Sequence, residues 1–247
     1  MIEVSDLYKS LAGKNVLNGI NLKIDKGILL TIIGGSGTGK SVFLKNILGL
    51  MKPDKGDIKI DEVYITQCNK KIFSSIRKKI GMVFQGNALL SSLTLFENVA
   101  LPLREHTKLK EQKIKELVFE KIAMVNLNGF EYYYPAELSG GMRKRAGIAR
   151  SLINNPSILL YDEPTTGLDP VIGNIINNLI VDLRDRLGVT SIVVTHDIIS
   201  ALKISDKIAM LYQGKIVFEG TPEQIKTTDN PVVQQFIQGK TEGPITE

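Results

Sequence analysis

One glycine-rich loop constrains the fold of this chain more than any other feature. Its sequence is Gly34-Gly35-Ser36-Gly37-Thr38-Gly39-Lys40-Ser41, and it directly follows an apolar, strand-sized run at residues 29–33. The loop matches the pattern G-x-x-x-x-G-K-[ST] in full, in which glycines let backbone N–H groups surround phosphate oxygens at the start of a helix. A buried strand followed by such a loop and a helix predicts an α/β fold with a mostly parallel sheet.

Two side chains of this loop carry chemistry. Lys40 would supply a compact positive charge to the β- and γ-phosphates of a nucleotide, and Ser41 would offer its hydroxyl to Mg²⁺. A glycine-rich turn can also simply join a strand to a helix. The complete match between an apolar run and a helical segment favours the phosphate site.

Two adjacent acids, Asp162 and Glu163, follow a second apolar run at residues 158–161. At the carboxyl end of a buried strand, Asp162 would hold Mg²⁺, and Glu163 would orient or deprotonate an attacking water. The simpler interpretation is that the acids cap the next helix. The phosphate loop upstream makes the catalytic interpretation the stronger one.

Other polar residues also follow predicted strands. His196 comes after the strand predicted at residues 191–195, where sheets of this kind bind ligands, and could contact the γ-phosphate. Gln85 follows the strand predicted at residues 80–84 and could sense the γ-phosphate or Mg²⁺. His106 has no such placement, and we interpret it as structural.

A second candidate anion site lies at Ser139-Gly140-Gly141, which opens a helix predicted over residues 142–154. A serine N-cap followed by two glycines exposes backbone N–H groups at the positive end of a helix dipole. Within one protomer this segment should lie away from the glycine loop. It becomes useful to catalysis only when a second copy of the chain presents it; otherwise it is a simple helix cap.

The remaining pattern predicts one domain with an insertion. Strand-like runs, including early ones at residues 2–7 and 20–24, alternate with helical segments through a core at residues 1–85 and 156–230. In between, residues 86–155 lose the strand signals and form a predicted helical subdomain, with helices at 95–101, 110–125 and 142–154. We interpret residues 231–247 as a short polar tail that is ordered only when something binds it.

The composition is typical of a globular protein, with 43% hydrophobic and 23% charged residues among 247. The net charge of +5 is not gathered into an aromatic-interleaved patch, so we expect no nucleic-acid partner. A single cysteine, Cys68, excludes an internal disulfide, and with two histidines a zinc site is not expected. The apolar runs are too short to span a bilayer, and the N-terminus does not resemble a signal peptide.

These motifs and their order resemble those of ATP-binding-cassette (ABC) ATPases over nearly the whole chain. The resemblance implies a P-loop NTPase (RecA-like) core with N-terminal antiparallel strands and an inserted helical subdomain. It also implies Mg²⁺-dependent hydrolysis of ATP between two copies of the chain. Met142 stands where the family's signature, here residues 138–142, more commonly has glutamine.

The resemblance also assigns roles to individual residues. Glu163, His196 and Gln85 match catalytic positions, and Ser41, Gln85 and Asp162 match the magnesium ligands. The nucleotide-binding positions are Tyr8 and Val16 beside the adenine, Gly34, Gly35, Ser36, Gly37, Thr38, Gly39, Lys40 and Ser41 around the phosphates, and Ser139, Gly140, Gly141 and Asp169 from the signature and the following D-loop.

A closer resemblance, to ATPases of the maintenance-of-lipid-asymmetry (Mla) type, is carried by residues 86–89, 98–106, Met142 and 231–244. It implies a phospholipid transporter with two ATPase copies, a membrane permease, an MCE-domain protein and in some systems a small STAS-domain protein. The ATPase would sit at the cytoplasmic face of the bacterial inner membrane, with a permease helix in a groove around residues 85–96. Some Mla-type ATPases reach their partner protomer through a longer tail; this chain ends at residue 247, so we do not expect that contact.

Three alternatives remain open. An ABC importer ATPase for a small solute, such as an amino acid, phosphate or ribonucleotide, would have the same fold and chemistry. A soluble, non-transport ABC ATPase acting on DNA or ribosomes usually has a long coiled coil or two cassettes, which this sequence lacks. A GTPase is disfavoured because Asn69-Lys70-Lys71-Ile72 lacks the aspartate of the guanine-reading pattern N-K-x-D.

Overall fold

The chain folds around a large, mostly parallel sheet, as the sequence predicts. The computed structural model describes residues 1–246, and in it the strands of this sheet lie in the order β10-β9-β3-β8-β7-β6. All neighbours pair in parallel except β10, which pairs antiparallel with β9 at one edge. The strands are β3 (Leu29–Ile33), β6 (Ile80–Val83), β7 (Ile158–Asp162), β8 (Thr190–Thr195), β9 (Lys207–Tyr212) and β10 (Lys215–Gly220).

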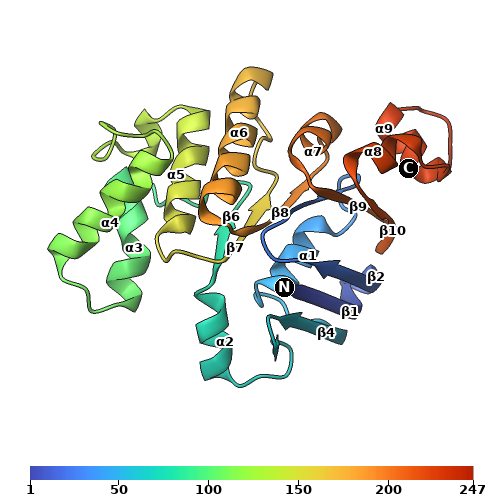
Figure 1. Cartoon of the computed structure of the whole chain (residues 1–247), viewed down its shortest axis with the longest axis horizontal. Helices are drawn as coiled ribbons and strands as arrows, with labels where there is room; N and C mark the ends of the chain where they lie inside the picture. The colour runs from blue at the N-terminus through green and yellow to red at the C-terminus, as the bar shows by residue number, and fades with distance from the viewer. Residues whose placement is uncertain (247) are drawn as a thin grey trace.

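A smaller antiparallel sheet packs beside it, in the order β2-β1-β4-β5 (Figure 1). Its strands are β1 (Ile2–Leu11), β2 (Lys14–Ile24), β4 (Lys55–Ile60) and β5 (Val63–Tyr64). The first two are longer than predicted because their ladder continues through polar pairs such as Ser10 with Asn15. A turn with positive φ at Ala12 and Gly13 closes this hairpin.

Residues 86–155 contain helices and no strand in the described structure, and they lie at one end of the molecule (Figure 1). The helices are α3 (Leu95–His106), α4 (Glu111–Met124) and α5 (Gly140–Leu152), with a 3-10 turn at Pro135–Glu137. A capping box of Thr94 and Glu97 starts α3. This helix runs past Pro102, beyond its predicted end, since Leu103 on the following turn is buried in the core.

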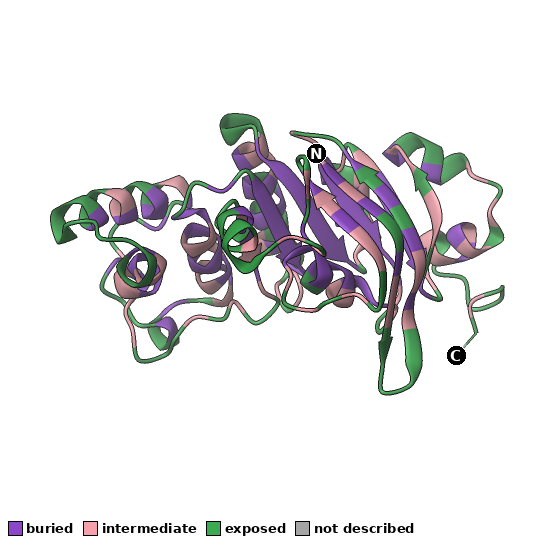
Figure 2. Cartoon of the chain, turned by 90° about the horizontal axis from the view of Figure 1, so that it is seen from below, coloured by how far each residue is buried: buried purple, intermediate pink, exposed green. Residues whose placement is uncertain are grey.

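Alternating residues of the central strands point into two cores on opposite faces of the large sheet, which Figure 2 shows as its buried centre. Leu159 and Tyr161 face the helices α3 to α5 and α6 (Pro170–Leu187), whereas Leu160 and Ile192 face α1 (Lys40–Ile47) and the small sheet. Each fully buried aliphatic side chain contributes about 1.5–3 kcal/mol. Two further helices outside the insertion are α2 (Lys70–Arg77) and α7 (Ile198–Ile204).

The expectation of a C-terminal tail without its own structure is wrong for residues 231–246. After α8 (Pro222–Thr227), the helix α9 (Pro231–Gln238) buries Val233 in a third apolar cluster. Gln235 then accepts a hydrogen bond from the Ile245 N–H at 2.6 Å, and the Tyr212 hydroxyl donates to the Pro244 carbonyl at 3.0 Å. The apolar residues of α9 recur at helical spacing, and they pack this segment against the rest of the chain.

Among residues 1–246, no helix has the length and apolar character needed to cross a membrane.

Candidate active site

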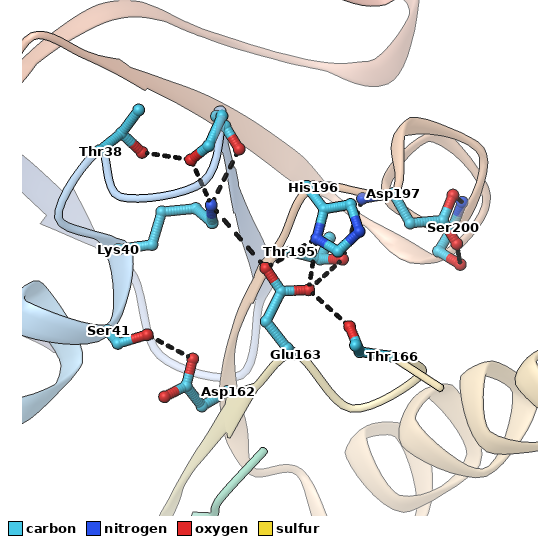
Figure 3. Close-up of polar contacts among 12 residues, drawn as sticks. Thr38, Lys40, Ser41, Asp162, Glu163, Thr166, Thr195, His196, Asp197 and Ser200 are labelled. Atoms are coloured by element: carbon cyan, nitrogen blue, oxygen red, sulfur yellow. Dashed lines mark hydrogen bonds and ion pairs between the residues drawn. The ribbon is translucent and has the colours of Figure 1, made fainter. Parts of the chain in front are cut away.

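The register of the parallel strands brings the predicted site residues together. Ile33 at the end of β3 pairs with Thr195 at the end of β8, and Asp162 at the end of β7 pairs with Val194. The segments that follow these strands therefore emerge at one edge of the sheet. Figure 3 shows the resulting cluster of Lys40, Ser41, Asp162, Glu163 and His196.

The glycine loop bends away from β3 at a position where only glycine fits. Gly34 has φ +156°, and a Cβ atom there would lie 2.4 Å from the Leu211 carbonyl oxygen. Further on, Gly39 adopts φ +104°, and its Cβ would lie 2.9 Å from both Val16 Cγ1 and the Val16 carbonyl oxygen. The loop is thus shaped by close backbone approaches, after which α1 begins at Lys40.

Lys40 is buried in the centre of the site, with 6% of its surface exposed. Its Nζ donates to the carbonyl oxygens of Gly34 and Gly35, each at 2.8 Å, and lies 3.8 Å from Glu163 Oε1. Burial lowers the pKa of the Lys40 ammonium, and the charge of Glu163 opposes that shift. A phosphate oxygen is a better partner for this cation than neutral carbonyls.

Ser41 and Asp162 place two oxygen atoms that could bind a metal ion beside the loop. Ser41 Oγ donates to Asp162 Oδ1 at 2.8 Å, and burial raises the pKa of the Asp162 carboxyl. Hydroxyl and carboxylate oxygens are the hard ligands that Mg²⁺ takes, together with water and substrate phosphates. The described residues contain no group of three or more His, Cys, Asp or Glu side chains that could hold a metal alone. The Ser41 hydroxyl and the Asp162 carboxylate fit a magnesium ion whose remaining ligands are water and a bound phosphate.

Glu163 is held in a strained backbone conformation. Its φ is +49°, in the left-handed region, which costs a residue other than glycine about 1–3 kcal/mol. The carboxylate accepts hydrogen bonds from Thr166 Oγ1 at 3.0 Å and Thr195 Oγ1 at 3.2 Å, and lies 3.0 Å from His196 Nδ1. Glu163 is buried, whereas half of the His196 side chain is exposed to the cavity edge. This arrangement can orient a water molecule next to a bound phosphate.

A cavity of about 400 Å³ opens over these residues. Within the described part of the chain its lining consists of Leu11, Val16, Ser36, Gly37, Gly39, Lys40, Ser41, Val42, Gln85, Glu163 and His196. Gln85 and Val16 thus line the same cavity as the glycine loop. Tyr8 lies outside this set, with its ring against Gly19 and the Lys55 ammonium 5.3 Å from the ring centre. Leu11 of the same strand lines the cavity instead.

The signature segment lies apart from this cavity. Ser139 caps α5 by accepting a hydrogen bond from the Met142 N–H at 3.3 Å, and Gly140 and Gly141 form the first turn. Both glycines lie close to the start of α6, since a Cβ on Gly140 would lie 3.3 Å from Leu168 Cδ2 and one on Gly141 would lie 2.5 Å from Ile172 Cγ2. Asp169 caps α6 by accepting from two backbone N–H groups at 3.0 Å. In one protomer Ser139 and Asp169 are thus the N-caps of α5 and α6.

Sequence reasoning missed several residues of the site. Thr166 and Thr195 hold the Glu163 carboxylate, and Lys144 on α5 donates to the Gln85 carbonyl. Thr195 could have been suspected, because it ends the strand that precedes His196. Lys144 gave no signal, because a lysine on a basic helix normally faces solvent.

Comparison with known proteins gives consistent similarities. Residues 17–166 match the family described as ABC transporter. The chain is 45% identical over 244 residues to the probable ribonucleotide transport ATP-binding protein mkl of Mycobacterium tuberculosis, covering 99% of this chain and 68% of that protein. It is 38% identical over 245 residues to the intermembrane phospholipid transport system ATP-binding protein MlaF of Haemophilus influenzae, covering 99% and 93%.

Among solved structures, the chain is similar to the ATP-binding cassette MJ0796, whose dimer was determined in a post-hydrolysis state bound to ADP and Pi. The TM-score is 0.82 at 35% identity, and the match covers 90% of this chain and 99% of that one. The predicted fold class, a P-loop core with antiparallel strands and a helical insertion, is confirmed by this likeness.

The geometry around Glu163 predicts the effect of Glu163→Gln. This change keeps the shape of the side chain but removes the charge that faces Lys40 and His196. We expect ATP binding to be retained, steady-state hydrolysis to fall by about 10²-fold or more, and a dimer to accumulate with ATP. Phosphate release and size-exclusion chromatography measure these effects, with Glu105→Gln on the exposed surface of α3 as control. If Glu163→Gln hydrolysed ATP at the wild-type rate, Glu163 would not be the residue that activates the attacking water.

The cavity lining predicts which residue the nucleotide base contacts. Leu11 and Val16 offer an aliphatic surface, so Leu11→Tyr should add stacking and tighten ATP binding about five- to tenfold. Tyr8→Leu should leave the dissociation constant within about twofold of wild type, because Tyr8 packs outside the cavity. Fluorescence titration with a labelled ATP analogue measures both. A large loss of affinity in Tyr8→Leu alone would restore Tyr8 as the adenine contact.

Proposed function

Because the chain belongs to the ABC transporter family, we propose that its ATP hydrolysis drives the movement of phospholipid between membranes. The predicted membership and enzymatic class are confirmed by the family match over residues 17–166 and by the likeness to hydrolysing cassettes. The lipid cargo is supported by MlaF, a phospholipid transport ATP-binding protein that aligns with 99% of this chain. The single observation that carries the cargo proposal is this full-length similarity.

In the proposed cycle, the triphosphate of ATP lies in the loop at residues 34–41 and replaces the carbonyl partners of Lys40. Ser41, Asp162 and Gln85 would hold Mg²⁺, which neutralises phosphate charge when bound. Glu163 and His196 orient the attacking water, and the two threonines keep the Glu163 carboxylate aimed at it. The protein supplies positioning and charge rather than a covalent intermediate.

A second copy of the chain would complete the site. Ser139, Gly140 and Gly141 lie away from the cavity of their own protomer, yet offer backbone N–H groups at a helix N-terminus. We propose that they contact the γ-phosphate bound by the partner, while Asp169 lies at the same interface. The dimer of the similar cassette bound to ADP and Pi supports this assembly.

The proposed partners are a membrane permease, an MCE-domain protein and a small STAS-domain protein. They would hold the ATPase at the cytoplasmic face of a bacterial inner membrane, peripheral through its permease. The segment at residues 85–96 remains the predicted contact for a permease helix, and Leu90 in it is 47% exposed. The support for these partners is the similarity to an ATPase named as part of an intermembrane transport system.

Import of a small solute is the second candidate function. The observation that favours it is the 45% identity to mkl, whose name assigns it to ribonucleotide transport. ATP binding and hydrolysis would be the same in both cases. The cargo and the accessory proteins would differ.

Isolation of the native complex distinguishes the two functions. We would tag the chain in its host, extract the membranes gently and identify co-purifying proteins and lipids by mass spectrometry, with an untagged strain as control. Phospholipid transport predicts a permease, an MCE-domain protein and enriched phospholipid. A different permease with a solute-binding protein would contradict the lipid proposal and leave the ATP site unaffected.

A further inference from the structure

The segment that starts at Gln85 lies along α5 with its carbonyl oxygens directed at that helix. Lys144 Nζ donates to the Gln85 carbonyl at 2.7 Å, and Arg150 donates to the Asn87 carbonyl at 2.9 Å. Between these two cations, Gly147 allows close approach, because its Cβ would lie 3.4 Å from the Asn87 carbonyl oxygen. The position of α5 therefore fixes the backbone at Gln85.

Lys144 has a second partner on the other side of the site. Its Nζ lies 3.4 Å from the main-chain carbonyl oxygen of Glu163, and only 4% of the residue is exposed. Burial lowers the pKa of this ammonium, while Glu163 and Asp162 act in the opposite direction. A buried cation is costly unless its donors are satisfied, so these two carbonyls account for its position.

The contact reaches Glu163 where its backbone is strained. With φ at +49°, the residue depends on its neighbours to keep this conformation. Its N–H donates to the Val194 carbonyl at 2.9 Å, and its carbonyl accepts from the Thr166 N–H at 3.3 Å and from Lys144. Lys144 is the member of this set that comes from α5, a helix of the inserted segment.

We propose that Lys144 is a positioning residue that ties the backbones of Glu163 and Gln85 to the position of α5. The same helix is capped by Ser139, which would face the nucleotide bound by a second copy. When the two copies come together, movement of α5 would then be transmitted through Lys144 to the Glu163 carboxylate, which orients water. This inference rests on the proposed role of Glu163 in hydrolysis.

The test compares Lys144→Met with Arg145→Met. Arg145 is a matched control: it also lies on α5 and donates to carbonyl oxygens, those of Val125 at 3.1 Å and Asn126 at 2.7 Å, away from the cavity. We expect Lys144→Met to lower kcat by about tenfold or more while KM for ATP stays within about twofold, because Glu163 is misplaced after binding. Arg145→Met should keep both constants within about twofold of wild type.

Lys144→Arg retains the charge and the donors, and should recover most of the kcat lost in Lys144→Met. Thermal denaturation of all variants shows whether each is folded during the assay. Two results for Lys144→Met would overturn the inference: a wild-type kcat, or a change in KM as large as the change in kcat. It would also be overturned if Arg145→Met lost as much kcat as Lys144→Met, or if Lys144→Arg recovered none of the lost kcat. Glu163→Gln in the same assay separates failure of the proposed function from failure of this inference. Full activity in Glu163→Gln would overturn the role of Glu163, and with it the role of Lys144.

Discussion

The in-register parallel pairing of β3, β8 and β7 is the constraint on which the site depends. Each strand ends at the same edge of the sheet. The glycine loop, His196 and the two acids therefore lie close together, although they are far apart in the sequence. The apolar residues of these strands supply the energy for this pairing, because they are buried on both faces. The chemistry is thus positioned by the core rather than by flexible loops.

Electrostatic compensation keeps the polar residues stable at this edge. Lys40, Lys144, Asp162 and Glu163 are all nearly inaccessible, and burial of unpaired charges would destabilise the fold. Carbonyl oxygens accept from the two lysines, the Ser41 hydroxyl donates to Asp162, and two threonine hydroxyls donate to Glu163, as Figure 3 shows for Lys40 and Asp162. Bound phosphate and a cation would replace these weaker partners with stronger ones.

The sequence predicted the parts of the structure that hydrophobic pattern and loop chemistry determine. The bounds of β3 and β7 match the predicted apolar runs, because those buried runs are bounded by glycine and by acids. Tyr8 illustrates the limit: the family resemblance assigned it to the adenine, but Leu11 of the same strand lines the cavity and Tyr8 does not. Lys144 and the folded C-terminal segment depend on long-range packing, which one sequence without coordinates does not show.

The central claim is that each nucleotide site is built from two copies of the chain. Mixed dimers of Lys40→Ala and Ser139→Arg test it most directly, since each variant alone has a defect in both sites. A mixed dimer would contain one site with both defects and one intact site. ATP hydrolysis that reappears on mixing, well above the sum of the separate proteins, is the predicted result. A mixture as inactive as its components would contradict the shared site.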